Sequence, residues 1–188
     1  MTTGNIDVIF ENMKYRRVTR AFTGEPVTDE ALFQVAQAGR FAASGGNLRP
    51  HRFFITRDPQ RVGLVRSFSP GMLAHPPAII AILIDHDQYQ RQWVSIDPSM
   101  IIYADVGTAA QNMLNMAHAL GLGSCPVSSF SKSGVREALG LPAHVSVEML
   151  ILLGHPEDVE RQVNPNAPKP VTTRELTSWE TFGKHAPG

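Results

Sequence analysis

The chain has 188 residues, of which 43% are hydrophobic and 18% charged, and its formal net charge is zero. This length suits one domain with a sizeable core, and the composition excludes a disordered chain. A neutral chain has no general electrostatic attraction to nucleic acid or to an anionic membrane. We therefore expect a globular protein with neither of these partners.

Cysteine usage and hydropathy indicate the setting. Cys125 is the only cysteine, which excludes an intramolecular disulfide and a Cys-rich metal site. No histidine or other base lies near it in the sequence, so we expect a small buried hydrophobe, not a catalytic thiol. No apolar run reaches the roughly 18 residues of a membrane span, and the start lacks a signal-peptide pattern. These features predict a reducing, cytoplasmic location.

The first half of the chain predicts alternating helices and strands. Apolar residues at helical spacing predict a helix over 6–13. Thr28, followed by two acidic residues, is the expected N-cap of a second helix that ends near Gly39. The run RFFIT at 52–56 is typical of a strand, and Asp-Pro at 58–59 predicts the start of a short helix.

The second half predicts two buried strands around a long helix. The apolar run 76–85 is typical of a buried central strand. Residues 97–124 form the longest helix candidate and are apolar almost all round, as in a core or at a subunit interface. A short helix is expected over 132–140 and a second buried strand over 146–154. The proline-rich tail 155–188 is expected to run extended.

The loop AASGGNLRP carries more special residues than a plain turn needs. Gly45 and Gly46 permit close backbone approach or positive φ, and Ser44 and Asn47 offer side-chain donors and acceptors. Pro50 ends the loop. The spacing matches neither a dinucleotide fingerprint nor a P-loop. Two interpretations stay open, an ordinary helix-to-strand connector and a loop that faces a flat or phosphorylated ligand.

A basic cluster follows the first predicted helix. Arg16, Arg17 and Arg20 occur within five residues. They suit either a solvated basic face or a phosphate site, because guanidinium groups bind phosphate oxygens in pairs. Arg174, near the other end of the chain, joins such a site only if folding brings it there.

The stretch CPVSSF, after the glycines at 121 and 123, offers backbone groups to the edge of a ring. The histidines show no HExxH spacing, and no GxSxG elbow is present. We therefore expect neither metal-dependent nor serine hydrolysis, and we assign no metal ligand.

Four stretches in order resemble motifs of one family. They are RRVTRAF, AASGGNLRPHRF, AAQNMLNMAHALGLGSCPV and KPVTTREL followed by WETFG. Together they resemble the nitroreductase family of FMN-dependent oxidoreductases over about residues 6–183. The resemblance implies an α+β sandwich with a central mixed sheet flanked by helices, working as an intertwined homodimer with FMN at the subunit interface. Residues 1–188 would form one FMN-binding domain whose tail, 155–188, crosses onto the partner.

The resemblance also implies cofactor-binding residues, which fall into four groups. The family's phosphate and ribityl contacts match Arg16, Arg17, Val18 and Arg20, and its C-terminal phosphate contact matches Arg174. The loop that the partner lays against the flavin matches Ala43, Ser44, Gly45 and Asn47. The segment near the reactive edge of the flavin matches Pro126, Val127, Ser128 and Ser129. Because the cofactor carries the chemistry in this family, no catalytic residue is assigned.

Some positions depart from the family pattern. Serine is common at Val18, proline at Ala43, tryptophan at His51 and Pro126, and glycine at Ser128 and Ser129. Proline is also common at Glu175, and Thr173 takes the place of Arg174 if the tail shifts by one residue. These departures leave FMN binding expected and bear on substrate choice and redox tuning.

The implied activity is NAD(P)H oxidation coupled by a ping-pong hydride mechanism to reduction of a nitroaromatic, a quinone or a similar electron-poor substrate. NADH and NADPH both remain possible donors. The short segment between Arg57 and Asp105 predicts an open pocket. The alternatives are a non-catalytic FMN carrier or redox sensor, an enzyme that fragments reduced flavin, and a dimer without flavin.

Overall fold

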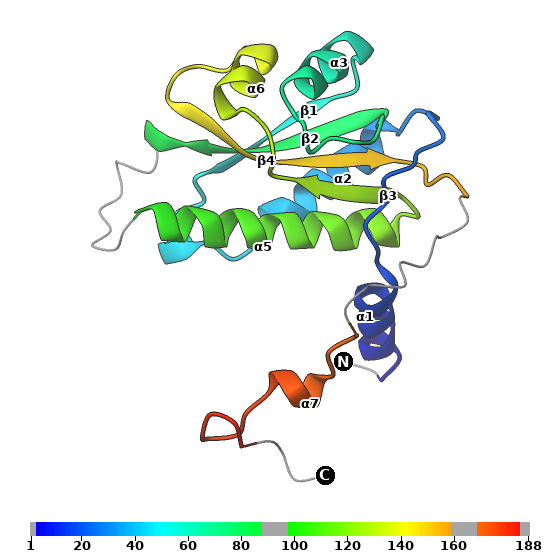
Figure 1. Cartoon of the computed structure of the whole chain (residues 1–188), viewed down its shortest axis with the longest axis vertical. Helices are drawn as coiled ribbons and strands as arrows, with labels where there is room; N and C mark the ends of the chain where they lie inside the picture. The colour runs from blue at the N-terminus through cyan, green and yellow to red at the C-terminus, as the bar shows by residue number, and fades with distance from the viewer. Residues whose placement is uncertain (1–2, 88–97, 159–168, 185–188) are drawn as a thin grey trace. The chain divides into compact units, whose positions relative to one another are not determined.

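The computed structural model describes residues 3–87, 98–158 and 169–184. The chain divides into two compact units, Met1–Glu157 and Asp158–Gly188. The first unit holds the sheet and most of the helices (Figure 1). The second holds the short helix α7 (Thr173–Leu176), so the predicted extended tail contains one helical turn.

After two helices and a 3₁₀ turn, strands and helices alternate along the first unit. The described elements are α1 (Thr3–Tyr15), α2 (Asp29–Arg40), the 3₁₀ turn η1 (Gly45–Asn47), β1 (His51–Thr56), α3 (Pro59–Ser67), β2 (Ala78–Asp85), α5 (Pro98–Ala119), β3 (Gly123–Val127), α6 (Lys132–Leu139) and β4 (Val145–Gly154). Part of the segment in which the sequence predicts an open pocket, residues 88–97, lies outside the described residues.

The four strands form one sheet in the order β1-β2-β4-β3. Every neighbouring pair runs antiparallel. The predicted α+β class is confirmed, but the described sheet is antiparallel, not mixed. The one parallel pairing among the described residues is an isolated bridge between Val18 and Ser124.

Helices cover both faces of the sheet: α2 and α5 lie on one side, α3 and α6 on the other (Figure 1). The position of β2 explains its continuous apolar sequence, because alternate residues of a strand point to opposite faces and helices cover both faces here. Ile80, Ile82 and Ile84 pack in the core with α2 and α5, whereas Ile79, Ala81 and Leu83 pack in the core with α3 and α6.

Local signals set most helix ends. The Thr28 hydroxyl accepts from the Ala31 N–H at 3.2 Å, which confirms the predicted N-cap. Gly140, with φ +67°, ends α6 as expected. The long helix α5 ends at Ala119, and Gly121, with φ +74°, closes it as expected and leads the chain into β3, so the candidate stretch to residue 124 is longer than the helix. β3 lies at the edge of the sheet, where a strand tolerates a proline such as Pro126.

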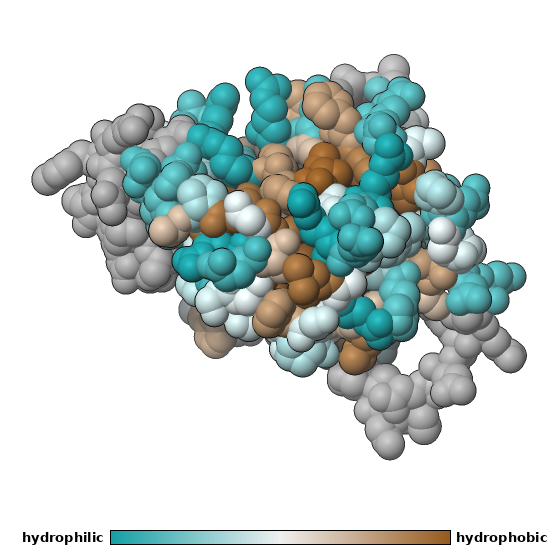
Figure 2. Space-filling model, turned by 90° about the horizontal axis from the view of Figure 1, so that it is seen from above, coloured by the Kyte–Doolittle hydropathy of each residue, from teal (hydrophilic) through white to brown (hydrophobic). Residues whose placement is uncertain are grey.

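Figure 2 views the face that carries α3 and α6. Apolar surface gathers near the middle of this face, with polar side chains around it. Leu64 of α3 and the following Phe68 and Leu73 are among the exposed large hydrophobic residues. Among the described residues, no helix combines the length and the apolar character that crossing a bilayer requires.

Candidate functional site

The arginine segment lies along the edge of β3. After α1 ends, Val18 forms a parallel bridge with Ser124, and the Thr19 N–H donates to the Ser124 carbonyl at 2.9 Å. A Cβ on Gly123 would lie 2.7 Å from Thr19 Cγ2, so a glycine is needed for this close approach. The structure thus brings the predicted arginine cluster beside the strand that leads to Pro126.

Arg16 and Arg17 differ in what their guanidinium groups contact. Nε and Nη1 of Arg16 are buried and have no hydrogen-bond partner in the described part of the chain. Arg17 instead donates to the backbone carbonyls of Lys14 and, at 2.8 Å, of Arg16. Buried guanidinium nitrogens without acceptors cost free energy, so an anion with several oxygens, such as a phosphate, suits the chemistry of Arg16.

Arg20 is exposed and lies close enough to Cys125 to act on its thiol. Burial raises the pKa of Cys125, and the positive charge of Arg20 offsets this only in part. The thiol therefore stays protonated at neutral pH, as expected for a buried structural cysteine.

The segment from Pro126 to Ser129 is part strand and part turn. Pro126 and Val127 belong to β3, and Ser128 and Ser129 are exposed beyond its end. The Gly71 N–H donates to the Ser129 carbonyl at 3.0 Å, so the turn is held in place by the chain after α3.

The loop after α2 is held largely by its own side chains. The Ser44 hydroxyl accepts from the Arg49 N–H at 3.1 Å, and Asn47 Oδ1 accepts from Arg49 Nε at 2.9 Å. Gly46, Asn47 and Arg49 all have positive φ, of 56°, 58° and 49°. Left-handed conformations at two non-glycine residues are uncommon and concentrate at functional sites.

α5 anchors this loop through a buried carboxylate. Asp105 is only 3% exposed, and its Oδ1 accepts from the Gly45 N–H at 2.8 Å. The Thr108 hydroxyl donates to the Ala43 carbonyl at 3.0 Å. A Cβ on Gly45 would lie 2.4 Å from Ile101 Cγ2. The motifs do not point to Asp105, although a single acidic residue within an apolar helix is a signal for it.

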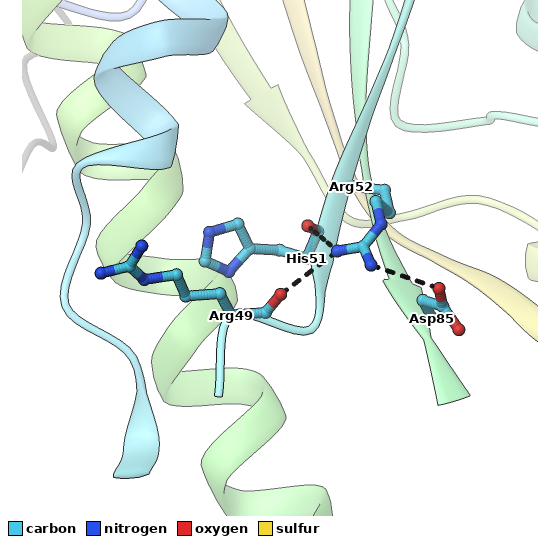
Figure 3. A network of polar contacts seen from close by, with 4 residues as sticks. All are labelled: Arg49, His51, Arg52 and Asp85. Atoms are coloured by element: carbon cyan, nitrogen blue, oxygen red, sulfur yellow. Dashed lines mark hydrogen bonds and ion pairs between the residues drawn. The ribbon is translucent and has the colours of Figure 1, made fainter. Parts of the chain in front are cut away.

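His51, at the start of β1, is buried beneath the same loop. Burial lowers its pKa, the charge of Asp105 partly opposes that shift, and Arg52 and Arg49 add to it. Figure 3 shows His51 between the two arginines. Arg52 donates to the carbonyls of Arg49 at 3.2 Å and of His51 at 3.0 Å, and pairs with Asp85 at 3.4 Å. These contacts tie the end of the loop to β1 and β2.

The two groups of candidate residues lie at different ends of α5. The loop contacts α5 near Asp105, whereas the arginine segment contacts Ser124 of β3, shortly after the last residue of the helix, Ala119. At 1.5 Å per residue, the helix separates Asp105 from Ala119 by about 20 Å. Among the described residues, no hydrogen bond joins the loop to the arginine segment. Arg174, the remaining candidate, lies on α7 in the second unit and is exposed.

Comparison with known proteins shows the family. The family model described as "Nitroreductase family" matches residues 13–70 and 63–155. The chain is 31% identical over 176 residues to the NADPH-flavin oxidoreductase of Vibrio harveyi, covering 88% of this chain and 72% of that one. The chain therefore belongs to the nitroreductase family, as its motifs predicted.

Solved structures agree. A Desulfovibrio desulfuricans protein described as a nitroreductase, in complex with FMN, has a TM-score of 0.74 at 29% identity, covering 93% of this chain and 97% of that one. A nitroreductase family protein from Clostridium difficile 630 has a TM-score of 0.76 at 23% identity, covering 92% and 98%. The second likeness concerns the fold alone.

Proposed function

We propose that this chain is an FMN-dependent oxidoreductase that takes electrons from NADH or NADPH. The observation that carries the proposal is that Nε and Nη1 of Arg16 are buried without a partner in the described residues, two residues before Val18 bridges to β3. The FMN complex of a relative with the same fold supports it. When bound, FMN accepts a hydride from NAD(P)H and passes two electrons to a second substrate.

The chain's own residues hold and orient the cofactor in this proposal. Arg16 neutralises the phosphate, with Arg17 and Arg20 adding positive charge along the same segment. Val18 has no polar side-chain atom and contributes backbone only. At the other end of β3, the Pro126–Ser129 segment places backbone groups and two exposed hydroxyls near the ring edge. Arg174, or Thr173 beside it, adds a further phosphate contact from the tail.

The site is completed by a second copy of the chain. The loop with Ala43, Ser44, Gly45 and Asn47 contacts α5 about 20 Å along the helix from its last residue, next to which the arginine segment lies. A homodimer supplies this loop from the partner subunit.

An exposed apolar surface supports the homodimer. On α1, Val8 is 67% and Phe10 68% exposed, and a groove of about 770 Å³ runs between α1 and the end of α5. An apolar helix face and groove of this kind are typical of a protein–protein interface. The tail 155–188 crosses onto the partner in this arrangement.

We propose nitroaromatics, quinones and similar electron-poor molecules as acceptors, reduced in ping-pong fashion at the site that NAD(P)H has left. The strained loop, fixed by Asp105, provides a rigid wall for a flat molecule. Because the reaction needs no protein acid or base at the cofactor, we assign no catalytic residue.

The visible absorption spectrum of the purified protein tests the proposal, followed by anaerobic addition of NADH or NADPH. We expect flavin bands that bleach on reduction, and the faster donor identifies the physiological one. Flavin bands that neither donor bleaches would contradict the enzymatic proposal and favour an FMN carrier. A colourless protein that binds no added FMN would contradict flavin binding itself.

A further inference from the structure

A polar cluster lies at the edge of β4, apart from the residues described so far. β3 pairs only with residues 150–154 of β4, so no described strand covers this edge along the first half of β4. In the same half the register against β2 shifts between Ile82 and Leu83, which leaves Glu148 as the extra residue of a β-bulge. Bulges commonly redirect a side chain near a functional site.

Glu148 is nearly buried, with 6% of its side chain exposed, and both of its oxygens have partners. Oε2 pairs with the Lys132 ammonium. Oε1 accepts from the Ser146 hydroxyl at 2.6 Å, and that hydroxyl lies 2.7 Å from Nε2 of His86. A buried carboxylate needs such partners to remain charged. Glu148, Ser146 and His86 therefore hold the Lys132 ammonium in place through a continuous chain of hydrogen bonds.

Lys132 connects the two sides of the sheet at this open edge. It begins α6, three residues after Ser129, and its ammonium also lies 5.7 Å from the centre of the Tyr103 ring on α5. α6 and α5 cover opposite faces of the sheet (Figure 1). Half of the Lys132 side chain is exposed, at 51%. Its charge is thus held in place and still open to a ligand.

We propose that Lys132 contacts the electron acceptor and selects acceptors that carry an oxygen group on a planar ring. This inference rests on the proposed function, because it places the acceptor beside the Pro126–Ser129 segment. The ammonium binds a carbonyl, nitro or carboxylate oxygen, and the Tyr103 ring provides an apolar wall next to it. Glu148, Ser146 and His86 are positioning residues that act through Lys132.

The chemistry of such acceptors explains why a fixed cation is useful there. A quinone or nitro oxygen gains negative charge as the acceptor takes up electrons. A cation that is already in place stabilises this charge without reorganisation. Most of the side-chain freedom of a lysine is lost in advance through Glu148, which lowers the entropic cost of binding.

Benzoate is a suitable probe, since it is planar, carries two oxygens and is not reduced. Its dissociation constant for the FMN-loaded protein is measured by isothermal calorimetry and by the perturbation of flavin absorbance. Lys132→Met should weaken benzoate binding roughly tenfold or more, the usual effect of losing a hydrogen bond to a charged group. Lys132→Arg should largely restore it. In turnover with 1,4-benzoquinone, Lys132→Met should raise KM.

The remaining variants separate positioning from folding. Glu148→Gln should weaken benzoate binding less than Lys132→Met. The exposed Glu137→Gln on α6 is the matched control and should have no effect. If Lys132→Met folds poorly with Glu148 left unpaired, the Lys132→Met/Glu148→Gln double variant removes both charges together.

Two failures can be told apart. An unsubstituted protein that binds no benzoate, or a Lys132→Met variant with unchanged benzoate affinity and KM, would overturn the inference while flavin reduction persists. An unsubstituted protein without flavin, or without reduction by NAD(P)H, would overturn the proposed function instead.

Discussion

The arginine segment and the loop after α2 carry the two main groups of family-matched residues, and they are built in opposite ways. Arg16 leaves two buried nitrogens without partners in the described chain. The loop is held by bonds within the chain, since Ser44 and Asn47 both bond to Arg49 and Asp105 Oδ1 binds Gly45. Beneath it, Asp105 Oδ2 and His51 Nδ1 are also buried without a partner in the described chain. The first region is prepared for a charged ligand. The second is a preformed wall, whose strain is held by buried contacts before any ligand binds.

The largest expected effect is at Arg16. Arg16→Ala should raise the FMN dissociation constant about 10- to 100-fold, because hydrogen bonds to charged groups are among the strongest in proteins. The flavin-free variant should unfold no more easily than the unsubstituted protein, since a buried unpaired charge has been removed. Fluorescence titration with FMN and urea denaturation measure the two effects. Arg57→Ala, which removes a surface pair with Asp29, is the control, and unchanged FMN affinity in Arg16→Ala would contradict the comparison.

At Asp105 the expected effect is on stability. Asp105→Ala leaves the partly buried Gly45 N–H without its acceptor and should lower the free energy of unfolding by about 1–3 kcal/mol. Asp105→Asn keeps an acceptor oxygen and should cost less. Urea denaturation of the flavin-free protein measures both. Equal stability of the Ala variant and the unsubstituted protein would show that the loop does not depend on this anchor.

Alanine substitutions at Gly45 and Gly46 test side-chain packing and backbone strain separately. Gly45→Ala places a Cβ 2.4 Å from Ile101 and should cost roughly 1–3 kcal/mol through overpacking. Ile101→Ala should relieve most of that cost in the double variant. Gly46→Ala meets nothing closer than 3.5 Å, and its φ of +56° should cost about 1 kcal/mol. Thermal unfolding of the four variants tests this order, and no relief from Ile101→Ala would contradict the packing explanation.

The smallest effect concerns pH. The pKa of His51 is lowered below its ordinary value of 6.5, mainly by burial. The unfolded chain therefore binds more protons than the folded chain as the pH falls below 6.5, and the free energy of unfolding should decrease there. Above 6.5 the neutral histidine has no such cost. His51→Gln should flatten this part of the stability–pH profile, and an identical slope in both proteins would exclude His51 as the cause.

The sequence predicts those structural features that depend on residues close together in the chain, and it does not predict those that depend on distant contacts. Hydrophobic periodicity and caps predict the helices, and the apolar runs predict β2 and β4. β3 is too short, and too rich in glycine and proline, to show a strand pattern. The family motifs identify Arg16 as a candidate, but its lack of a partner is a tertiary property. Asp105 and the Lys132–Glu148 pair join residues far apart in the chain, which a single sequence does not reveal.

The central claim is that each flavin site takes Arg16 from one chain and the loop from another. Co-expression of an Arg16→Ala chain with a Gly46→Val chain, each with its own affinity tag, tests it directly. Val at a positive φ distorts the loop, so each variant alone should retain little FMN. The doubly purified hybrid has one intact composite site and should hold about one FMN per pair of chains. A hybrid that retains no more FMN than either variant alone would contradict the account.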